Sequence, residues 1–92
     1  MKEIPKLRRH IDEIDDQILE LINQRLQAAS RIGEIKNRSG TGVVDTKRES
    51  WIYQRLSSLN KGPLKETALH RIFETIIAAG REVQSKDENT KK

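Results

Sequence analysis

The chain has 92 residues and a mass of 10.6 kDa, which fits one small domain, and with 34% hydrophobic and 3% aromatic residues a monomer would have only a thin core. It contains no cysteine, which excludes disulfides, Cys-ligated zinc and a thiol nucleophile, and no apolar run approaches the roughly 18 residues of a membrane span, so we expect a cytoplasmic protein without a membrane partner. The formal net charge of +4 favours anionic partners, but 14 acidic residues make this excess modest for a protein that binds nucleic acid.

The sequence predicts a first helix over about residues 5–38. Pro5 suits the first turn of a helix, and Ser39-Gly40-Thr41-Gly42 supplies a stop. Between them, apolar residues recur at alternating steps of four and three, a heptad pattern that is sustained over four repeats. The positions of this heptad stripe, apolar except for the arginine, are Leu7, Ile11, Ile14, Ile18, Leu21, Arg25, Ala28, Ile32 and Ile35.

Two shorter helices are predicted to follow. The second begins at Asp45 or Thr46, where Thr46-Lys47-Arg48-Glu49 has the form of a capping box, and it ends before the break at Asn60-Lys61-Gly62-Pro63. The third covers about residues 64–84, with an apolar face made of Leu69, Ile72, Phe73, Ile76, Ile77 and Val83. We therefore expect residues 1–84 to form one all-α domain, and residues 85–92 to form a polar, disordered C-terminal tail.

The length of the first helix predicts how the chain assembles. A helix of about 34 residues is about 50 Å long, whereas a compact globule of 92 residues is only about 30 Å across. The first helix must therefore project beyond the core of its own chain, and its heptad stripe stays apolar over the projecting part. Because a second copy of the same helix is the simplest partner for that stripe, we expect an intertwined helical homodimer.

Two cations of the first helix stand out from its pattern. Arg25 occupies a position of the heptad stripe, where burying an unpaired guanidinium costs several kcal/mol. Lys36 follows three turns later and about 20° around the helix, so it shares the face of Arg25. Each residue also has a purely structural explanation. Arg25 would form a buried ion pair or extend its head group to solvent, and Lys36 would be a solvated lysine near a helix C-terminus.

The other two helices also place polar residues on their inward faces. The apolar face of the second helix begins with Asp45 and Glu49, with Arg48 beside them, and the face of the third helix ends with Gly80 and Gln84. Taken singly, these residues are explained by capping, surface exposure or fraying of a helix end. Together with the two cations of the first helix they predict a pocket for a small, rigid polyanion, because arginine binds carboxylates through two parallel hydrogen bonds.

The sequence offers no groups for covalent or metal chemistry. It contains no evident nucleophile–base pair, no His/Asp/Glu cluster with metal-ligand spacing and no Gly-rich phosphate loop, and His10 and His70 are expected at the surface. An enzyme built in this way would act by positioning and electrostatics. We expect neither a metal nor a cofactor.

Over residues 4–84 the sequence resembles the all-helical class (type II) of chorismate mutase. The order and the spacing of several short segments together carry this resemblance. The segments are Leu7-Arg8-Arg9-His10-Ile11-Asp12-Glu13-Ile14-Asp15, Leu21-Ile22-Asn23-Gln24-Arg25, Gly33-Glu34-Ile35-Lys36, Val44-Asp45-Thr46-Lys47-Arg48-Glu49, and Ile76-Ile77 followed by Gln84.

The resemblance implies a homodimer of intertwined three-helix chains that isomerises chorismate to prephenate, a step towards phenylalanine and tyrosine, without a covalent intermediate. By the pattern of the family, Arg25 and, from the other protomer, Arg8 would grip the two carboxylates of the substrate. Helix geometry agrees with a shared site, because these arginines lie about 25 Å apart along one helix and about 100° apart around it. An antiparallel partner helix would bring the second chain's Arg8 back to Arg25.

The remaining roles implied by the resemblance concern the ether oxygen and the ring hydroxyl. Lys36 and Gln84 would donate hydrogen bonds to the ether oxygen, where negative charge grows as the C–O bond breaks. Asp45, through its backbone, and Glu49 would hold the ring hydroxyl, with Arg48 nearby.

Gly80 is a departure from the family pattern. Some members of the family carry a small polar residue at this position that contacts the substrate. Either that contact is dispensable in this chain, or a water replaces it, so Gly80 stays a candidate substrate-binding residue.

Three alternatives remain open at this point. By resemblance, a lyase that removes pyruvate from isochorismate uses the same scaffold and the same carboxylate clamps. A basic helical dimer that binds nucleic acid would need cations on an outer face and a recognition helix, and the sequence shows neither. A regulatory or scaffolding module would dock on another enzyme of the aromatic pathway, and such docking is also compatible with catalysis.

Overall fold

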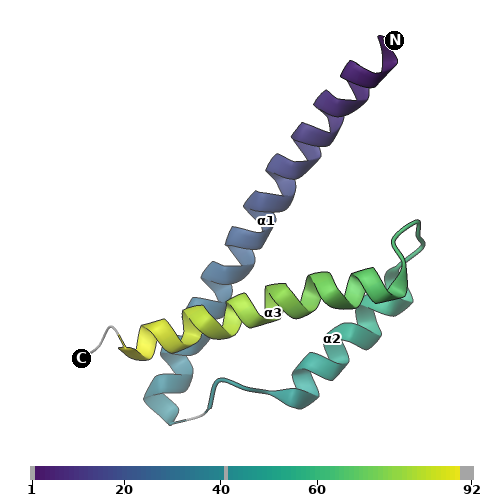
Figure 1. Ribbon diagram of the computed structural model, residues 1–92. Coiled ribbons are helices and arrows are strands. Elements are labelled where there is room, and N and C mark those ends of the chain that lie inside the picture. The colour runs from purple at the N-terminus through teal and green to yellow at the C-terminus, as the bar shows by residue number, and fades with distance from the viewer. Residues whose placement is uncertain (1, 41, 90–92) are drawn as a thin grey trace.

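The computed structural model describes residues 2–40 and 42–89, with side chains described up to residue 85. Three helices make up the chain: α1 (Glu3–Ser39), α2 (Thr46–Leu59) and α3 (Glu66–Asn89) (Figure 1). The described residues contain no strand. The prediction of an all-α fold with one long and two shorter helices is therefore confirmed.

The C-terminal helix is longer than the sequence analysis predicts. α3 begins at Glu66 and continues to Asn89, past the predicted end at residue 84. The segment Ser85-Lys86-Asp87-Glu88 contains neither glycine nor proline, so its polar composition does not stop the helix. Residues 85–89 are thus helical rather than part of a tail, and the last residues of the expected tail, 90–92, lie outside the described residues.

Two short connections separate the helices. Gly40 ends α1 in the left-handed conformation, with φ of 74°, and its backbone N–H donates to the carbonyl oxygens of Asn37 and Lys36. A glycine adopts this conformation without steric cost, which explains the stop that the sequence predicts. Between α2 and α3, the side-chain amide of Asn60 donates to the carbonyl oxygen of Leu64 at 2.8 Å. This contact closes the turn that returns α3 along α2.

The first turn of α2 is capped differently from the predicted capping box. Asp45 is the N-cap residue, and its carboxylate accepts a hydrogen bond from the backbone N–H of Arg48 at 3.0 Å. Thr46 is the first residue of the helix. The capping box headed by Thr46 is therefore wrong, because Asp45 satisfies the free backbone N–H group and the carboxylate of Glu49 binds a residue of α3 instead.

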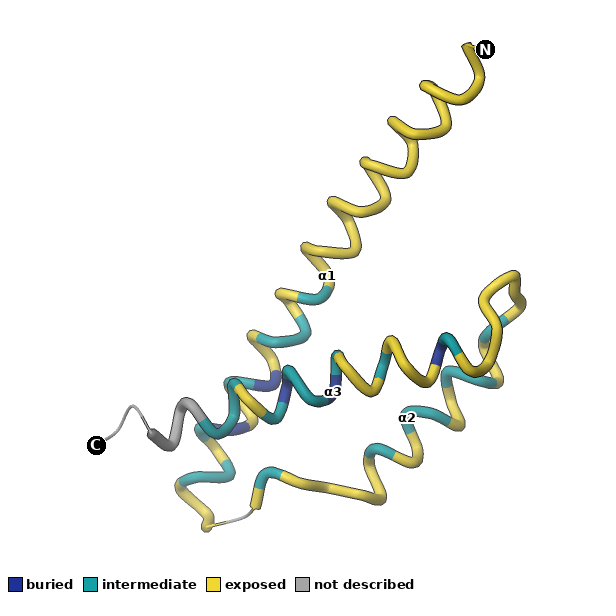
Figure 2. Tube along the Cα trace, viewed as in Figure 1, coloured by how far each residue is buried: buried dark blue, intermediate teal, exposed yellow. Residues whose placement is uncertain are grey.

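α3 packs against both of the other helices, whereas the backbones of α1 and α2 stay apart in the described residues. The buried apolar side chains are Ala29 of α1 together with Leu69 and Ile77 of α3. Figure 2 shows most of the buried positions where α3 crosses the C-terminal half of α1, and a further one near the beginning of α3. So few buried side chains confirm the prediction of a thin core for a single chain.

The N-terminal half of α1 projects from this core (Figures 1 and 2). Every residue from 2 to 21 is exposed, and the chain extends 57 Å along its longest axis. Its radius of gyration of 16.7 Å exceeds the value near 12 Å of a compact chain of this length. Apolar residues of the heptad stripe are among the exposed ones, for example Leu7 at 60% and Ile11 at 54%. In the described part of the chain, no helix is both long enough and apolar enough to cross a membrane.

We expect Gly33→Ala to destabilise the protein, because Gly33 lies where α1 meets α3. A methyl group at this position would lie 2.8 Å from the Cα atom of Gln84, and a backbone atom cannot rotate away. Overpacking of this kind costs about 1–3 kcal/mol, which outweighs a gain in helix propensity of at most about 1 kcal/mol. Urea unfolding at a fixed protein concentration measures the difference.

The matched control for this prediction is Gly42→Ala. A methyl group at Gly42 would meet no atom within 4 Å, so this substitution should leave the free energy of unfolding unchanged or slightly higher. A Gly33→Ala protein as stable as the wild type would show that the two helices are less tightly packed than we infer.

Candidate active site

A cavity of about 400 Å³ lies among the C-terminal half of α1, the beginning of α2 and the C-terminal half of α3. This volume is typical of pockets for small molecules. Apolar residues from all three parts form much of its wall: Ala28, Ala29, Ile32, Val43, Ile52 and Ile77. The structure brings seven of the eight predicted site residues to this wall: Arg25, Lys36, Asp45, Arg48, Glu49, Gly80 and Gln84.

α1 supplies the two cations that the heptad pattern singled out. Arg25 and Lys36 both line the cavity, as their shared helix face predicts. Both residues are partly buried, and among the described residues neither forms an ion pair. A buried ion pair of Arg25 within one chain is therefore not the reason for its position. Two unpaired cations on the wall of the cavity favour an anionic ligand.

Gly80 of α3 lies directly against Arg25. A Cβ atom at Gly80 would lie 3.7 Å from Nη1 of Arg25 and 3.7 Å from Cβ of Ala29. Both distances are ordinary van der Waals contacts, so a small side chain would fit at this position. Gly80 thus leaves room for a side chain as small as a methyl group beside the Arg25 guanidinium.

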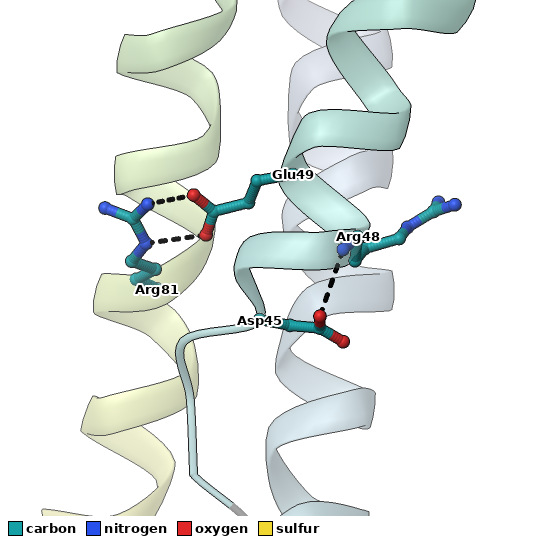
Figure 3. Close-up of polar contacts among 4 residues, drawn as sticks. All are labelled: Asp45, Arg48, Glu49 and Arg81. Carbon is teal, nitrogen blue, oxygen red and sulfur yellow. Dashed lines mark hydrogen bonds and ion pairs between the residues drawn. The ribbon is translucent and has the colours of Figure 1, made fainter.

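The first turn of α2 directs its side chains to different sides. Figure 3 shows the side chain of Glu49 extending toward α3, whereas that of Arg48 extends away from it. The guanidinium carbon of Arg48 lies 4.8 Å from the centre of the Trp51 ring, a cation–π contact. Asp45 keeps its carboxylate on the backbone N–H of Arg48. Glu49 is thus the carboxylate of this turn that reaches across to the neighbouring helix.

Glu49 is held by Arg81 of α3, a residue that the sequence analysis did not select. Nε of Arg81 donates to Oε2 of Glu49 at 3.0 Å, and the Nη2 group of Arg81 donates to Oε1 (Figure 3). The hydrogen bond to Glu49 raises the pKa of Arg81 above its ordinary value, so Arg81 stays charged. The sequence could have indicated Arg81 as a residue of the site, because Arg81 precedes Gln84 by three residues and therefore shares its helix face.

The charges of Glu49 and Arg81 also affect the hydroxyl group of Tyr53 in α2. Partial burial is the largest cause that raises the pKa of the Tyr53 hydroxyl, and the negative charges of Glu74 and Glu49 add to it. Tyr53 also stacks on His70, with ring centres 4.5 Å apart. His70 is exposed, as predicted.

Gln84 of α3 lies where α3 packs against α1. Its backbone packs on Gly33, and its side-chain Oε1 atom is buried without a hydrogen-bond partner in the described part of the chain. An unsatisfied buried amide costs about 1–3 kcal/mol. The side chain lines the cavity, and because Oε1 is an acceptor, only a hydrogen-bond donor would relieve this cost.

Arg8 is the predicted site residue that the structure does not bring to the cavity. It lies in the projecting part of α1, where every side chain is exposed. At 1.5 Å per residue it is about 25 Å from Arg25 along the helix.

Without Arg8, the cavity of one chain has a formal net charge of +2. It is lined by four cationic side chains (Arg25, Lys36, Arg48 and Arg81) and two acidic ones (Asp45 and Glu49).

We expect Arg25→Met to leave the melting temperature unchanged or higher while it abolishes turnover. Arg25 has no ionic partner in the described part of the chain, so its removal breaks no pair and relieves repulsion among the cations of the cavity. A structural ion pair would give the opposite result, a loss of about 3–5 kcal/mol. Arg31→Met is the control, because Arg31 pairs with Glu34 on the exposed face of α1. A clear drop in melting temperature for Arg25→Met alone would contradict the assignment of Arg25 to ligand binding.

Comparison with known proteins places this fold and cavity in a family. The sequence profile of the family described as chorismate mutase type II matches residues 7–85. A chorismate mutase of Methanocaldococcus jannaschii is 35% identical over 85 residues, which cover 91% of this chain and 86% of that protein. A bifunctional chorismate mutase/prephenate dehydratase of Aquifex aeolicus is 38% identical over 90 residues, and the chain spans 25% of its length.

A solved structure has the same fold. It is a conserved hypothetical protein from Pyrococcus furiosus, with a TM-score of 0.76, 32% identity and coverage of 91% of this chain and 97% of that one. The relatives thus include a protein of nearly the length of this chain, and bifunctional proteins in which a matching segment is one part of a longer chain. Because the family profile spans all three helices and the mutase from M. jannaschii matches over most of both chains, this chain belongs to the chorismate mutase type II family, as the resemblance of its sequence implies.

Proposed function

We propose that this chain isomerises chorismate to prephenate in a pocket shared by two copies of the chain. The observation that carries the proposal is the cavity with its two unpaired cations, Arg25 and Lys36, and a formal net charge of +2. A dicarboxylate substrate is attracted by this positive charge, to which Arg8 of the partner subunit adds in the proposed pocket. An intramolecular rearrangement needs no nucleophile, so a pocket that positions the substrate and stabilises developing charge is sufficient.

In the proposed complex, Arg25 binds one carboxylate of the substrate and Arg8 of the partner subunit binds the other. Lys36 and the amide of Gln84 donate hydrogen bonds to the ether oxygen. As the C–O bond breaks, negative charge grows on this oxygen, so both donors bind the transition state more tightly than the substrate. The side-chain NH2 group of Gln84 is the donor that this role requires, and the side chain lines the cavity.

The other end of the substrate lies against α2 and α3. The backbone of Asp45 and the carboxylate of Glu49 hold the ring hydroxyl, and Arg48, which lines the cavity, adds positive charge nearby. Gly80 leaves room for a group as small as a methyl next to the Arg25 guanidinium. The apolar residues of the wall lower the effective dielectric constant of the site, which strengthens these electrostatic contacts.

A homodimer is part of this proposal because one chain leaves an apolar surface uncovered. Most of the large exposed apolar residues in the projecting part of α1 lie on the heptad stripe, namely Leu7, Ile11, Ile14, Ile18 and Leu21, whereas Leu19 lies off it. A continuous apolar stripe of this length marks an interaction surface, and an antiparallel second copy covers it with an equivalent stripe. The same arrangement brings Arg8 of the partner subunit to the open cavity.

The proposal is tested with the purified protein and chorismate. We expect loss of chorismate absorbance with formation of an equal amount of prephenate, and no turnover by the Arg25→Ala variant. Isochorismate is assayed in parallel, because release of pyruvate from it would identify the lyase reaction instead. A folded, dimeric protein that leaves chorismate unchanged would refute the proposed function. The cytoplasmic location and the docking on another enzyme of the aromatic pathway stay predictions.

A further inference from the structure

The pair formed by Glu49 and Arg81 connects the beginning of α2 to the C-terminal half of α3 at the wall of the cavity. The fork of Arg81 binds both carboxylate oxygens, one through Nε at 3.0 Å and the other through Nη2. The Glu49 side chain is 19% exposed and that of Arg81 is 40% exposed. The carboxylate is thus the more enclosed partner, and the guanidinium approaches it from the solvent side.

A two-point contact fixes a carboxylate in a way that a single hydrogen bond does not. Glutamate has three rotatable side-chain bonds, and a planar fork that binds both oxygens selects one orientation of the group. Each carboxylate oxygen has a second lone pair, so Glu49 can still accept a hydrogen bond from a ligand hydroxyl. Arg81 therefore orients the acceptor without using its full capacity.

The same pair affects the other cations of the cavity. Arg25 and Lys36 line the cavity together with Glu49, and in the described residues neither has an ionic partner. A Glu49 carboxylate without Arg81 would be attracted to these two cations, which lie in a partly apolar site where charges interact strongly. Such a contact would compete with the substrate for both groups.

We propose that Arg81 is a positioning residue of this active site: it orients the Glu49 carboxylate toward the ring hydroxyl and keeps it away from Arg25 and Lys36. The inference rests on the proposed function. Arg81 itself does not contact the substrate, and its substitution affects turnover only by changing the position of the Glu49 carboxylate.

A double-mutant cycle tests this dependence. In the wild-type background, Arg81→Met should lower kcat/KM for chorismate by about tenfold or more, as expected for two directly coupled residues. In a Glu49→Gln background, the same substitution should change kcat/KM by less than about twofold, because the charge that Arg81 positions is already absent. Arg81→Lys keeps a cation near Glu49 and should recover part of the lost activity.

Two outcomes would overturn the inference. If Arg81 binds the substrate directly, Arg81→Met lowers kcat/KM by the same factor in both backgrounds. If Arg81 only joins α2 to α3, its substitution lowers the melting temperature and leaves kcat/KM of the folded protein unchanged. Should Arg81→Met not fold, the comparison of Arg81→Lys in the two backgrounds gives the same distinction.

Arg71→Met is the matched control, because Arg71 is an exposed arginine of the same helix that does not line the cavity. In each background it should leave kcat/KM at the value of the parent protein, the wild type or Glu49→Gln. The wild-type protein separates this inference from the proposed function. An inactive wild type refutes the proposed function, whereas an active wild type with an additive cycle refutes only the role of Arg81.

Discussion

Homodimers of Arg8→Ala and homodimers of Arg25→Ala are each expected to lose nearly all turnover of chorismate. In the proposed dimer every pocket takes one arginine from each chain, so either substitution removes one carboxylate clamp from every pocket. Loss of one partner of a buried charge pair costs about 2–5 kcal/mol, which corresponds to a roughly 30- to 5,000-fold loss in kcat/KM. Arg9→Ala is the control, because Arg9 lies next to Arg8 on the exposed part of α1 and has no role in the proposed pocket.

A mixture of the two variants should regain activity. Unfolding and refolding them together produces about half heterodimers if pairing is random. In each heterodimer one pocket lacks both arginines and the other has both, because the chain without Arg8 faces the chain without Arg25. Activity should therefore return to roughly a quarter of the wild-type value. If both arginines acted within one chain, every pocket would still lack one of them. No recovery after verified subunit exchange would then rule out the shared pocket.

Lys36→Ala and Gln84→Ala are expected to reduce kcat far more than they raise KM. Both donors are proposed to act on the ether oxygen, where negative charge develops only as the C–O bond breaks. Removal of one such donor costs about 10²–10³ in kcat. Steady-state kinetics on chorismate measures both constants, and Lys47→Ala serves as the control because Lys47 is exposed and does not line the cavity. A variant with wild-type kinetics would remove that residue from the site, and a loss confined to KM would assign it to substrate binding.

Gln84→Glu tests the same role through pH. A carboxyl group donates a hydrogen bond only while it is protonated. The variant should therefore retain activity at acidic pH and lose it as the pH rises, whereas the wild type keeps its amide donor throughout. A variant with the same pH profile as the wild type would show that position 84 does not donate to the ether oxygen.

Local rules were enough to predict the three helices, apart from the C-terminal end of α3, and one face of the site. The four-three spacing of apolar residues predicts α1, and the conformation of Gly40 and the cap at Asp45 explain two of the helix ends. The same periodicity places Arg25 and Lys36 on one face of α1, and both line the cavity. Because α1 is longer than a compact globule of 92 residues is wide, the sequence also predicts that part of α1 projects from the core. The N-terminal half of α1 does project and is exposed.

How residues from different helices meet could not be predicted from these local rules. The pair of Glu49 and Arg81 joins residues 32 positions apart, and a capping box was the simpler explanation of Glu49 because it needs only neighbours in the sequence. The close approach of Gly33 to Gln84 likewise depends on how α1 crosses α3. Periodicity tells which face of a helix is apolar, but it does not tell which side chain of the next helix lies opposite. That choice depends on the crossing geometry and on packing across the whole core.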